Sequence, residues 1–549
     1  MDLWTEVSGG SGGTEGYEND EVIADVYTEH DANVDPDTDA EDTKPFEVAM
    51  PKFLSPAGRE DQAREREKEE IAERGEEDNE EEEDDEERID EDEDDEEEEA
   101  EGERRRGGER LIPEVPANEI DDFDDDDVII GGVYPDLDAD VVSETDAEMA
   151  DGGQSEDDRD TTAAEARRGK DIQGIPWQRF DSTREQYRED RLHLREHYEN
   201  IKATWSPEQL MKECSKFEKG AAYYDFRFNT RAVRSAYIHF QLRNLVWATT
   251  KHDVYTMSNH AIHHWSATSR KCTEVLNLRG QGDFQAPRGM GEVQISTMCA
   301  RRNLLIAGGY SGEMVCKNLD QPGIAYSGKI TTDENAITNA IAILDTTSGG
   351  KQVMTSSNDS TVRLFDADSF SLVTQLKFPW PVNHTALSPN RKLLCVVGDD
   401  PQGFLVEFET GKILSSLDGH ADFSFASAWH PNGLVVATGN QDTTCRLWDI
   451  RFLASAFCTL KGRIGAIRSL RYTSDGQFLA MAEPRDFIHI FDSKQDYKRS
   501  QEIDLFGEIA GISFSPDDEA FFIGVSDRYF SSLLEYNRAR YNEYYDCFL

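Results

Sequence analysis

The sequence predicts an all-β protein, a seven-bladed β-propeller, preceded by a disordered acidic arm and short helices. The first observation is a repeat of short apolar runs, each ending in an aromatic residue followed by an acidic one. The aromatic residues are 43, 40 and 43 positions apart, which is the blade period of a propeller. They are Phe365, Phe408, Trp448 and Phe491. The second observation is a turn acid that recurs in the same place of the repeat, as Asp359, Asp442, Asp486 and Asp527.

Extending this register in both directions gives seven units of about 44 residues each. Because a propeller hides its strand edges by closing into a ring, one strand must come from outside the consecutive repeats. Two stretches before the repeats can supply it, AYYDFRF (222–228) and AYIHFQ (236–241), and the sequence does not decide between them. The units span about 235–285, 290–330, 333–378, 380–418, 419–461, 462–505 and 506–540.

Residues 1–165 form the acidic arm. The first 160 residues hold about 65 acidic and 13 basic side chains, so they carry nearly all of the chain's net charge of -55. A segment with so much charge and so little apolar surface cannot offset its ordering entropy, and we expect it to be disordered. Its charge repels nucleic acid and anionic membranes and favours basic partners such as histones. Alternatively, the arm only keeps the protein soluble.

Residues 166–220 form a predicted loop and helical bridge to the propeller of residues 221–549. Ser182, with Glu185 three positions later, is typical of a capping box. Ser206 before Pro207 predicts a second helix, which ends at Gly220. One apolar face of this helix is expected to pack against the propeller. It consists of Leu210, Met211, Cys214 and Phe217.

The eight cysteines are scattered without Cys-x-x-Cys pairs. This spacing predicts buried thiols in a reducing compartment rather than a zinc site. The N-terminal MDLWTEVSGG is not typical of a secretory signal, and no apolar run approaches membrane-spanning length. We therefore expect an intracellular protein of the cytoplasm, the nucleus or both. No phosphate loop, metal-ligand spacing or nucleophile motif indicates an enzyme, a metal site or a cofactor.

The stretch from Gly419 to Arg451 is the most complete repeat. Four of its residues match the buried polar relay of WD repeats, in which an acid bonds a histidine and the histidine reaches a strand hydroxyl and an indole. A buried polar group is stable only when it is bonded, so the set holds the blade as a unit. We interpret this set of residues as structural, although a His, an Asp and a hydroxyl in one repeat resemble a catalytic constellation. The four are His420, Thr438, Asp442 and Trp448.

The chain from QGIPW (173–177) onward resembles an uncharacterised WD-repeat family of fungi and plants whose members carry an acidic N-terminal arm. The resemblance rests on long stretches that are not generic blade sequence. Among them are FPWPVNH, GHADFSFASAWHP, GNQDTTCRLWDIR and GEIAGISFSPDDEAFFIGVSDR. It implies the propeller fold and no particular activity.

The box Trp448-Asp449-Ile450-Arg451 is the first candidate interaction site. A W-D-x-R box at the end of a blade resembles the docking box of substrate receptors of cullin–RING ubiquitin ligases, whose arginine projects to the adaptor protein. Arginine suits this role because its planar, permanently charged fork can bond carboxylates at two points. The alternative is an ordinary repeat end. We thus predict a WD-repeat protein–protein interaction scaffold, with Trp448, Asp449 and Arg451 docking a ligase adaptor. The alternative function is a histone- or chromatin-associated adaptor that uses the acidic arm.

Aromatic loops form the second candidate site. The segments 378–384 and 420–430 place Trp380, Phe423 and Phe425 next to expected strands. Propeller loops at one mouth commonly form a peptide-binding surface, and aromatic side chains suit it. The alternative interpretation of these side chains is core packing between neighbouring blades.

Overall fold

The computed structural model describes residues 160–194, 206–258, 260–279, 291–333 and 335–540. They all belong to the second of two compact units of the chain, Glu119–Leu549. Nearly all of the expected acidic arm therefore lies outside the described residues. The last six residues of that expected arm, 160–165, do have structure: they form a short strand and the start of a helix.

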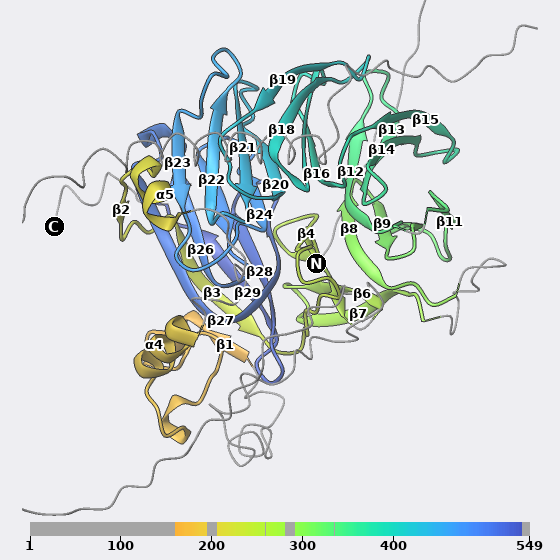
Figure 1. Cartoon of the computed structure of the whole chain (residues 1–549). Coiled ribbons are helices and arrows are strands. Elements are labelled where there is room, and N and C mark those ends of the chain that lie inside the picture. Colours follow the sequence, from red (N-terminus) through yellow and green to blue (C-terminus); the bar gives the residue numbers. More distant parts are fainter. Residues whose placement is uncertain (1–159, 195–205, 259, 280–290, 334, 541–549) are drawn as a thin grey trace, which may run out of the picture. The chain divides into compact units, whose positions relative to one another are not determined.

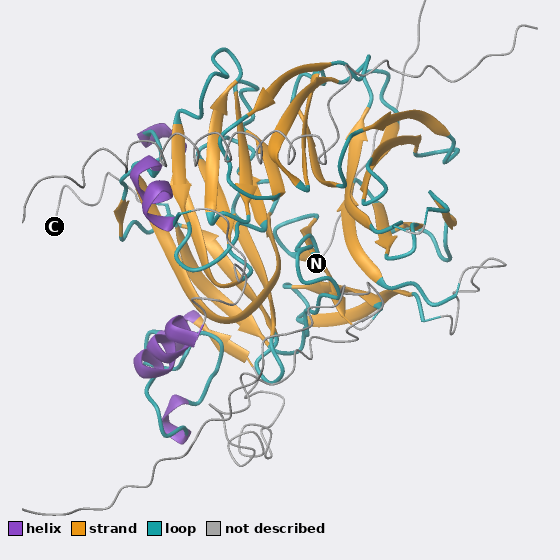
Figure 2. Cartoon of the chain, in the orientation of Figure 1, coloured by secondary structure: helices purple, strands orange, loops and turns teal. Residues whose placement is uncertain are grey.

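Four-stranded antiparallel sheets of consecutive strands are the repeating element of the fold, which confirms the predicted all-β class (Figures 1 and 2). The first holds β4 (Val246–Ala248), β5 (Asp253–Ser258), β6 (Ala261–Ser266) and β7 (Lys271–Asn277). The second holds β8 (Ile295–Arg301), β9 (Leu304–Gly309), β10 (Glu313–Asn318) and β11 (Tyr326–Lys329). The third holds β12 (Thr338–Asp345), β13 (Lys351–Ser357), β14 (Thr361–Asp366) and β15 (Leu372–Lys377).

Two further sheets repeat this plan. One holds β16 (Val382–Leu387), β17 (Leu393–Gly398), β18 (Asp400–Glu407) and β19 (Ile413–Leu417). The other, which contains the complete repeat, holds β20 (Ser424–Trp429), β21 (Val435–Asn440), β22 (Thr444–Asp449) and β23 (Cys458–Lys461). In each sheet the strands pair in chain order, so every sheet corresponds to one of the units expected from the sequence.

A larger sheet combines the last two units. It runs from β24 (Ser469–Tyr472) through β25 (Phe478–Ala482), β26 (Arg485–Asp492), β27 (Arg499–Phe514), β28 (Ala520–Ser526) and β29 (Ser532–Arg538) to β3 (Tyr224–Thr230) and β1 (Asp160–Thr162). The first half of β27 pairs with β26 and its second half with β28. Gly507, with a φ of +122°, lies between the halves, where β27 passes from one unit to the next.

The first strands of the units contact one another in turn: β4, β8, β12, β16, β20, β24 and β27, which in turn contacts β4. This closed order is consistent with the expected seven blades. The closing strand is β3, from the first candidate stretch, and it pairs antiparallel with β29. The second candidate, AYIHFQ, forms turns instead. The N-terminal β1 and β2 (Glu218–Lys219) add to this sheet, β1 on β3 and β2 parallel to β27.

The helices differ in detail from the sequence prediction. They are α3 (Ala163–Ala166), α4 (Arg184–Leu194), α5 (Pro207–Glu213) and the 3₁₀ turns η2 (Trp177–Arg179) and η3 (Ser493–Gln495). At the start of α4 the reciprocal capping bonds join Thr183 and Gln186, one residue later than expected. Ser206 makes no side-chain capping bond, and α5 ends at Glu213 because the chain then turns into β2.

Only part of the apolar face expected on the second helix is buried. Leu210 is buried and Phe217 packs edge-on against Phe491, but Met211 is 54% exposed. The face is shorter than expected because the helix stops before Phe217.

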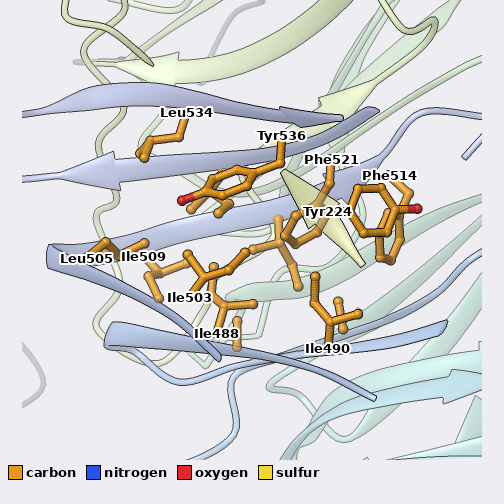
Figure 3. Packing of buried hydrophobic residues seen from close by; sticks show 14 of the residues in the cluster. Tyr224, Ile488, Ile490, Ile503, Leu505, Ile509, Phe514, Phe521, Leu534 and Tyr536 are labelled. Atoms are coloured by element: carbon orange, nitrogen blue, oxygen red, sulfur yellow. The ribbon is translucent and has the colours of Figure 1, made fainter. Parts of the chain in front are cut away.

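The largest core cluster lies in the combined sheet and shows why β3 closes it (Figure 3). Tyr224 of β3 is 1% exposed and packs against Phe514 and Phe521. Its hydroxyl donates to the backbone oxygen of Asp518 at 2.8 Å. Burying such a side chain contributes about 1.5–3 kcal/mol, so the N-terminal strand is held by packing as well as by its hydrogen bonds.

Candidate functional site

The structure brings the four relay residues together in the sheet of β20 to β23. His420 precedes β20, Thr438 lies on β21, and Trp448 lies on β22. The His420 Nδ1 atom lies 3.0 Å from Asp442 Oδ2, and its Nε2 atom lies 2.8 Å from Thr438 Oγ1. The Trp448 indole N–H donates to the same hydroxyl at 2.9 Å. All four side chains are buried.

Asp442 is fully occupied by these contacts. Besides His420, it accepts hydrogen bonds from the backbone of Ala421 and from both the backbone and the hydroxyl of Thr444. Burial raises the pKa of Asp442, but His420 and these donors together hold that pKa below its usual value. The set therefore connects the loop before β20 to the β21–β22 turn.

Arg451 lies just beyond β22, at the opposite end of the sheet from His420. Its side chain is 67% exposed. Its guanidinium donates to Asp449 twice, from Nε at 2.9 Å and from an Nη atom at 2.6 Å. These bonds lower the pKa of Asp449 to about 2. Trp448, the third expected docking residue, is fully buried and can only support the surface.

Two exposed phenylalanines accompany this arginine. Phe452 is 69% exposed and Phe457 is 52% exposed, although both belong to a short loop between β22 and β23. The loop is anchored from beneath, because Ile450, Leu453 and Ala456 pack against a buried cluster that includes Leu417 and Trp429 of β19 and β20. Neither phenylalanine is among the site residues predicted from the sequence. The available signal was a pair of aromatics, in RFLASAF, on a turn directly after the W-D-x-R box.

The expected mouth surface requires correction. Trp380 is 6% exposed and stacks on Phe404 with ring centroids 5.3 Å apart, so it belongs to the core. Phe425 is 4% exposed and lies beneath the guanidinium of Arg468 at 4.1 Å. Phe423 alone of the three remains exposed, at 41%. The aromatic residues at the start of these strands mainly fill the space between sheets, as the core-packing alternative holds.

A second buried polar pair replaces the relay in the following unit. Glu483 and His489 are 0% and 1% exposed, and Glu483 Oε1 lies 2.7 Å from His489 Nε2. The same carboxylate accepts backbone hydrogen bonds from Arg463, Ile464 and Gly465. The pair thus ties the preceding loop to the sheet with other residue types.

The residues that the structure describes hold neither a metal cluster nor a membrane-spanning helix. Within them, no group of three or more His, Cys, Asp or Glu side chains is arranged to hold a metal ion. Likewise, no helix in the part of the chain that the structure describes is long and apolar enough to cross a membrane.

Comparison with known proteins agrees with the fold. Residues 411–449 match the family model of the WD domain, G-beta repeat. This segment is a WD40 repeat. It contains all four relay residues, and it ends two residues before Arg451.

Similar proteins occur in fungi, animals and plants, which is a wider range than the fungal and plant family expected from the sequence. An uncharacterised protein of Schizosaccharomyces pombe is 25% identical over 183 residues, covering 31% of this chain and 52% of its own. WD repeat-containing protein 37 of Homo sapiens is 25% identical over 233 residues, 40% of this chain and 46% of its own. Pre-mRNA-processing factor 19 homolog 2 of Arabidopsis thaliana is 22% identical over 233 residues, which cover 41% of this chain and 42% of its own. The chain thus spans about half the length of these curated relatives.

Proposed function

We propose that this chain is a WD-repeat scaffold that docks the adaptor protein of a cullin–RING ubiquitin ligase through the loop Asp449–Phe457, called here the docking loop. The observation that carries the proposal is the joint exposure of Arg451, Phe452 and Phe457 on a loop with a buried anchor. Large aromatic side chains and arginine dominate the binding energy of protein interfaces. Leaving two phenylalanines in water is unfavourable unless a partner covers them.

The ion pair between Arg451 and Asp449 fits this role. It fixes the direction of the guanidinium, because Nε and one Nη atom are both engaged by the same carboxylate. The other Nη atom is left to face a partner, and an arginine held in place loses less rotamer entropy on binding. An exposed pair of this kind adds little to folding, so stability alone does not explain it.

The test is binding of a purified cullin–RING adaptor to the full-length chain and to Arg451→Ala and Phe452→Ala variants. Both substitutions are expected to weaken binding at least tenfold, the effect of losing an interface anchor. Arg540→Ala is the matched control, because Arg540 is an exposed arginine (74%) that pairs with a single carboxylate, that of Glu519. Equal adaptor binding by the wild type and both loop variants, or no binding by the wild type, would overturn the proposal.

The alternative function, a histone- or chromatin-associated adaptor, depends on the acidic arm. Nearly all of that arm lies outside the described residues, and no specific contact in the described part of the chain favours this alternative. It stays a prediction from charge alone.

A further inference from the structure

Arg471 lies on β24, the first strand of its unit. One Nη atom donates to the side-chain oxygen of Asn244 at 2.7 Å, and the other donates to the backbone oxygen of Leu470 at 3.0 Å. The guanidinium carbon lies 5.0 Å from the ring centre of Trp247, on β4. The side chain therefore reaches from β24, past β27, to the segment that leads into β4.

The charge of Arg471 also acts on residues of two other first strands. His384 lies on β16, and burial together with the nearby Arg471 lowers its pKa to about 3. Cys299 lies on β8 and interacts electrostatically with the same guanidinium. Because β4, β8, β16 and β24 are the first strands of four different sheets, the guanidinium faces the space that the first strands enclose.

No carboxylate of the described residues neutralises this arginine. Among the residues that the structure describes, Arg471 forms no ion pair, and burial lowers its pKa to about 10. Further positive charge, that of Arg243 and Arg468, acts on the half-buried His239, five residues before Asn244. Glu508 accepts from Arg243 and pairs with Arg485. A half-buried cation without a counter-charge loses part of its hydration, and a bound anion would offset that loss.

We infer that the space enclosed by the first strands binds an oxyanion, a phosphate or carboxylate group, at the guanidinium of Arg471. Arg471, Trp247 and His384 are half-buried rather than closed off, so solvent reaches this position. The Ser427 hydroxyl lies 2.8 Å from His384 Nδ1 and is a neutral polar group. Ser427 belongs to β20, which is the first strand of a further sheet. Oxyanions suit the site because arginine bonds them with two parallel N–H groups, which a chloride ion cannot use in the same way. This site is separate from the docking loop and does not depend on the proposed function.

The test uses the full-length chain and inorganic phosphate as the probe. Thermal unfolding is followed in phosphate and in chloride at equal ionic strength and pH. A ligand that binds only the folded state raises the unfolding temperature, so phosphate is expected to raise it by a few degrees more than chloride does. Arg471→Met, which keeps an unbranched apolar stem but removes the guanidinium and its charge, is expected to lose the difference. Arg528→Met, at an exposed arginine, is expected to keep it.

A second experiment distinguishes a free phosphate group from a carboxylate of an acidic segment as the bound oxyanion. An acidic peptide with the sequence of residues 91–100, EDEDDEEEEA, replaces phosphate. If it stabilises the wild type but not Arg471→Met, the site takes carboxylates from an acidic segment; if only phosphate does so, the site takes a free phosphate group. If Arg471→Met does not fold, equilibrium dialysis of radiolabelled phosphate with the wild type replaces the comparison, and about one bound phosphate per chain is expected. Equal stabilisation of wild type and Arg471→Met, or no effect of either anion and no bound phosphate, would overturn the inference.

Discussion

The side-chain amide of Gln173 bonds the backbone of Phe506 twice. Gln173 Nε2 donates to the Phe506 oxygen at 2.7 Å, and the Phe506 N–H donates to Gln173 Oε1 at 2.7 Å. Phe506 lies where β27 passes from one blade to the next, and its ring packs against Trp177. Arg188 of α4 stacks on the same ring at 3.8 Å and pairs with Asp486 at 2.9 Å. The helical bridge is thus attached to the propeller at the point where β27 passes from one blade to the next.

We expect Gln173→Ala to destabilise the chain by about 2–3 kcal/mol, because it leaves a buried N–H and a buried carbonyl without their partners. Urea unfolding followed by tryptophan fluorescence measures the change. Gln402→Ala is the matched control, since Gln402 is an exposed residue of β18. A Gln173→Ala variant as stable as the control would show that the hydrogen bonds between Gln173 and Phe506 do not stabilise the fold.

We expect Asp442→Ala to cost about 3–5 kcal/mol, because His420 and three backbone or hydroxyl donors lose their buried acceptor. The same unfolding measurement gives the value. Asp320→Ala, at an exposed aspartate, should change stability by less than about 0.5 kcal/mol. Similar values for the two variants would contradict a structural role for the relay.

Stability should fall as the pH falls from about 6.5 towards 3, and His384 should account for part of this loss. Its pKa in the folded chain is about 3, below its ordinary value of 6.5. The unfolded chain therefore takes up the proton first, and acid favours unfolding by at most about 1.4 kcal/mol per pH unit. His384→Gln should flatten the plot of unfolding free energy against pH in this window. An unchanged slope between pH 7 and 5 would mean that His384 is not held neutral.

Trp380→Ala should lower the stability of the fold far more than Phe423→Ala. The first removes a buried ring from between two sheets and should cost about 3–5 kcal/mol, whereas the second removes a largely exposed ring and should cost less than about 0.5 kcal/mol. Thermal unfolding of both variants tests the correction of the mouth surface. If Trp380→Ala were as stable as wild type, Trp380 would be free to serve as a binding surface.

The blade order could be predicted from the sequence because its signals are local. The relay residues lie within one repeat, and their types and spacing are set by the need to bond every buried polar atom. Three of the aromatic strand ends, Phe365, Trp448 and Phe491, fill the same place in their sheets, next to last in β14, β22 and β26. The fourth, Phe408, lies one residue beyond β18, where Val406 takes that place.

Contacts between distant segments could not be predicted in this way. Gln173 and Phe506 lie 333 positions apart, and no local sequence pattern around either residue predicts a contact with the other. The closing strand was undecided because both candidate stretches are apolar and aromatic, and only pairing with β29 distinguishes them. Burial of Trp380 and exposure of Phe452 also depend on neighbouring sheets, so residue type alone left Trp380 open between surface and core and missed Phe452.

The docking loop is the central claim, and site-specific photo-crosslinking tests it most directly. A photoreactive phenylalanine analogue replaces Phe452 in one full-length chain and Phe423 in another, and each is irradiated with the purified cullin–RING adaptor. Both side chains are exposed, but they lie at opposite ends of the same sheet, because β20 starts after Phe423 and β22, parallel to it, ends before Phe452. We predict a crosslinked adaptor from position 452 and none from position 423. Crosslinking from 423 alone, or from neither position, would contradict the claim.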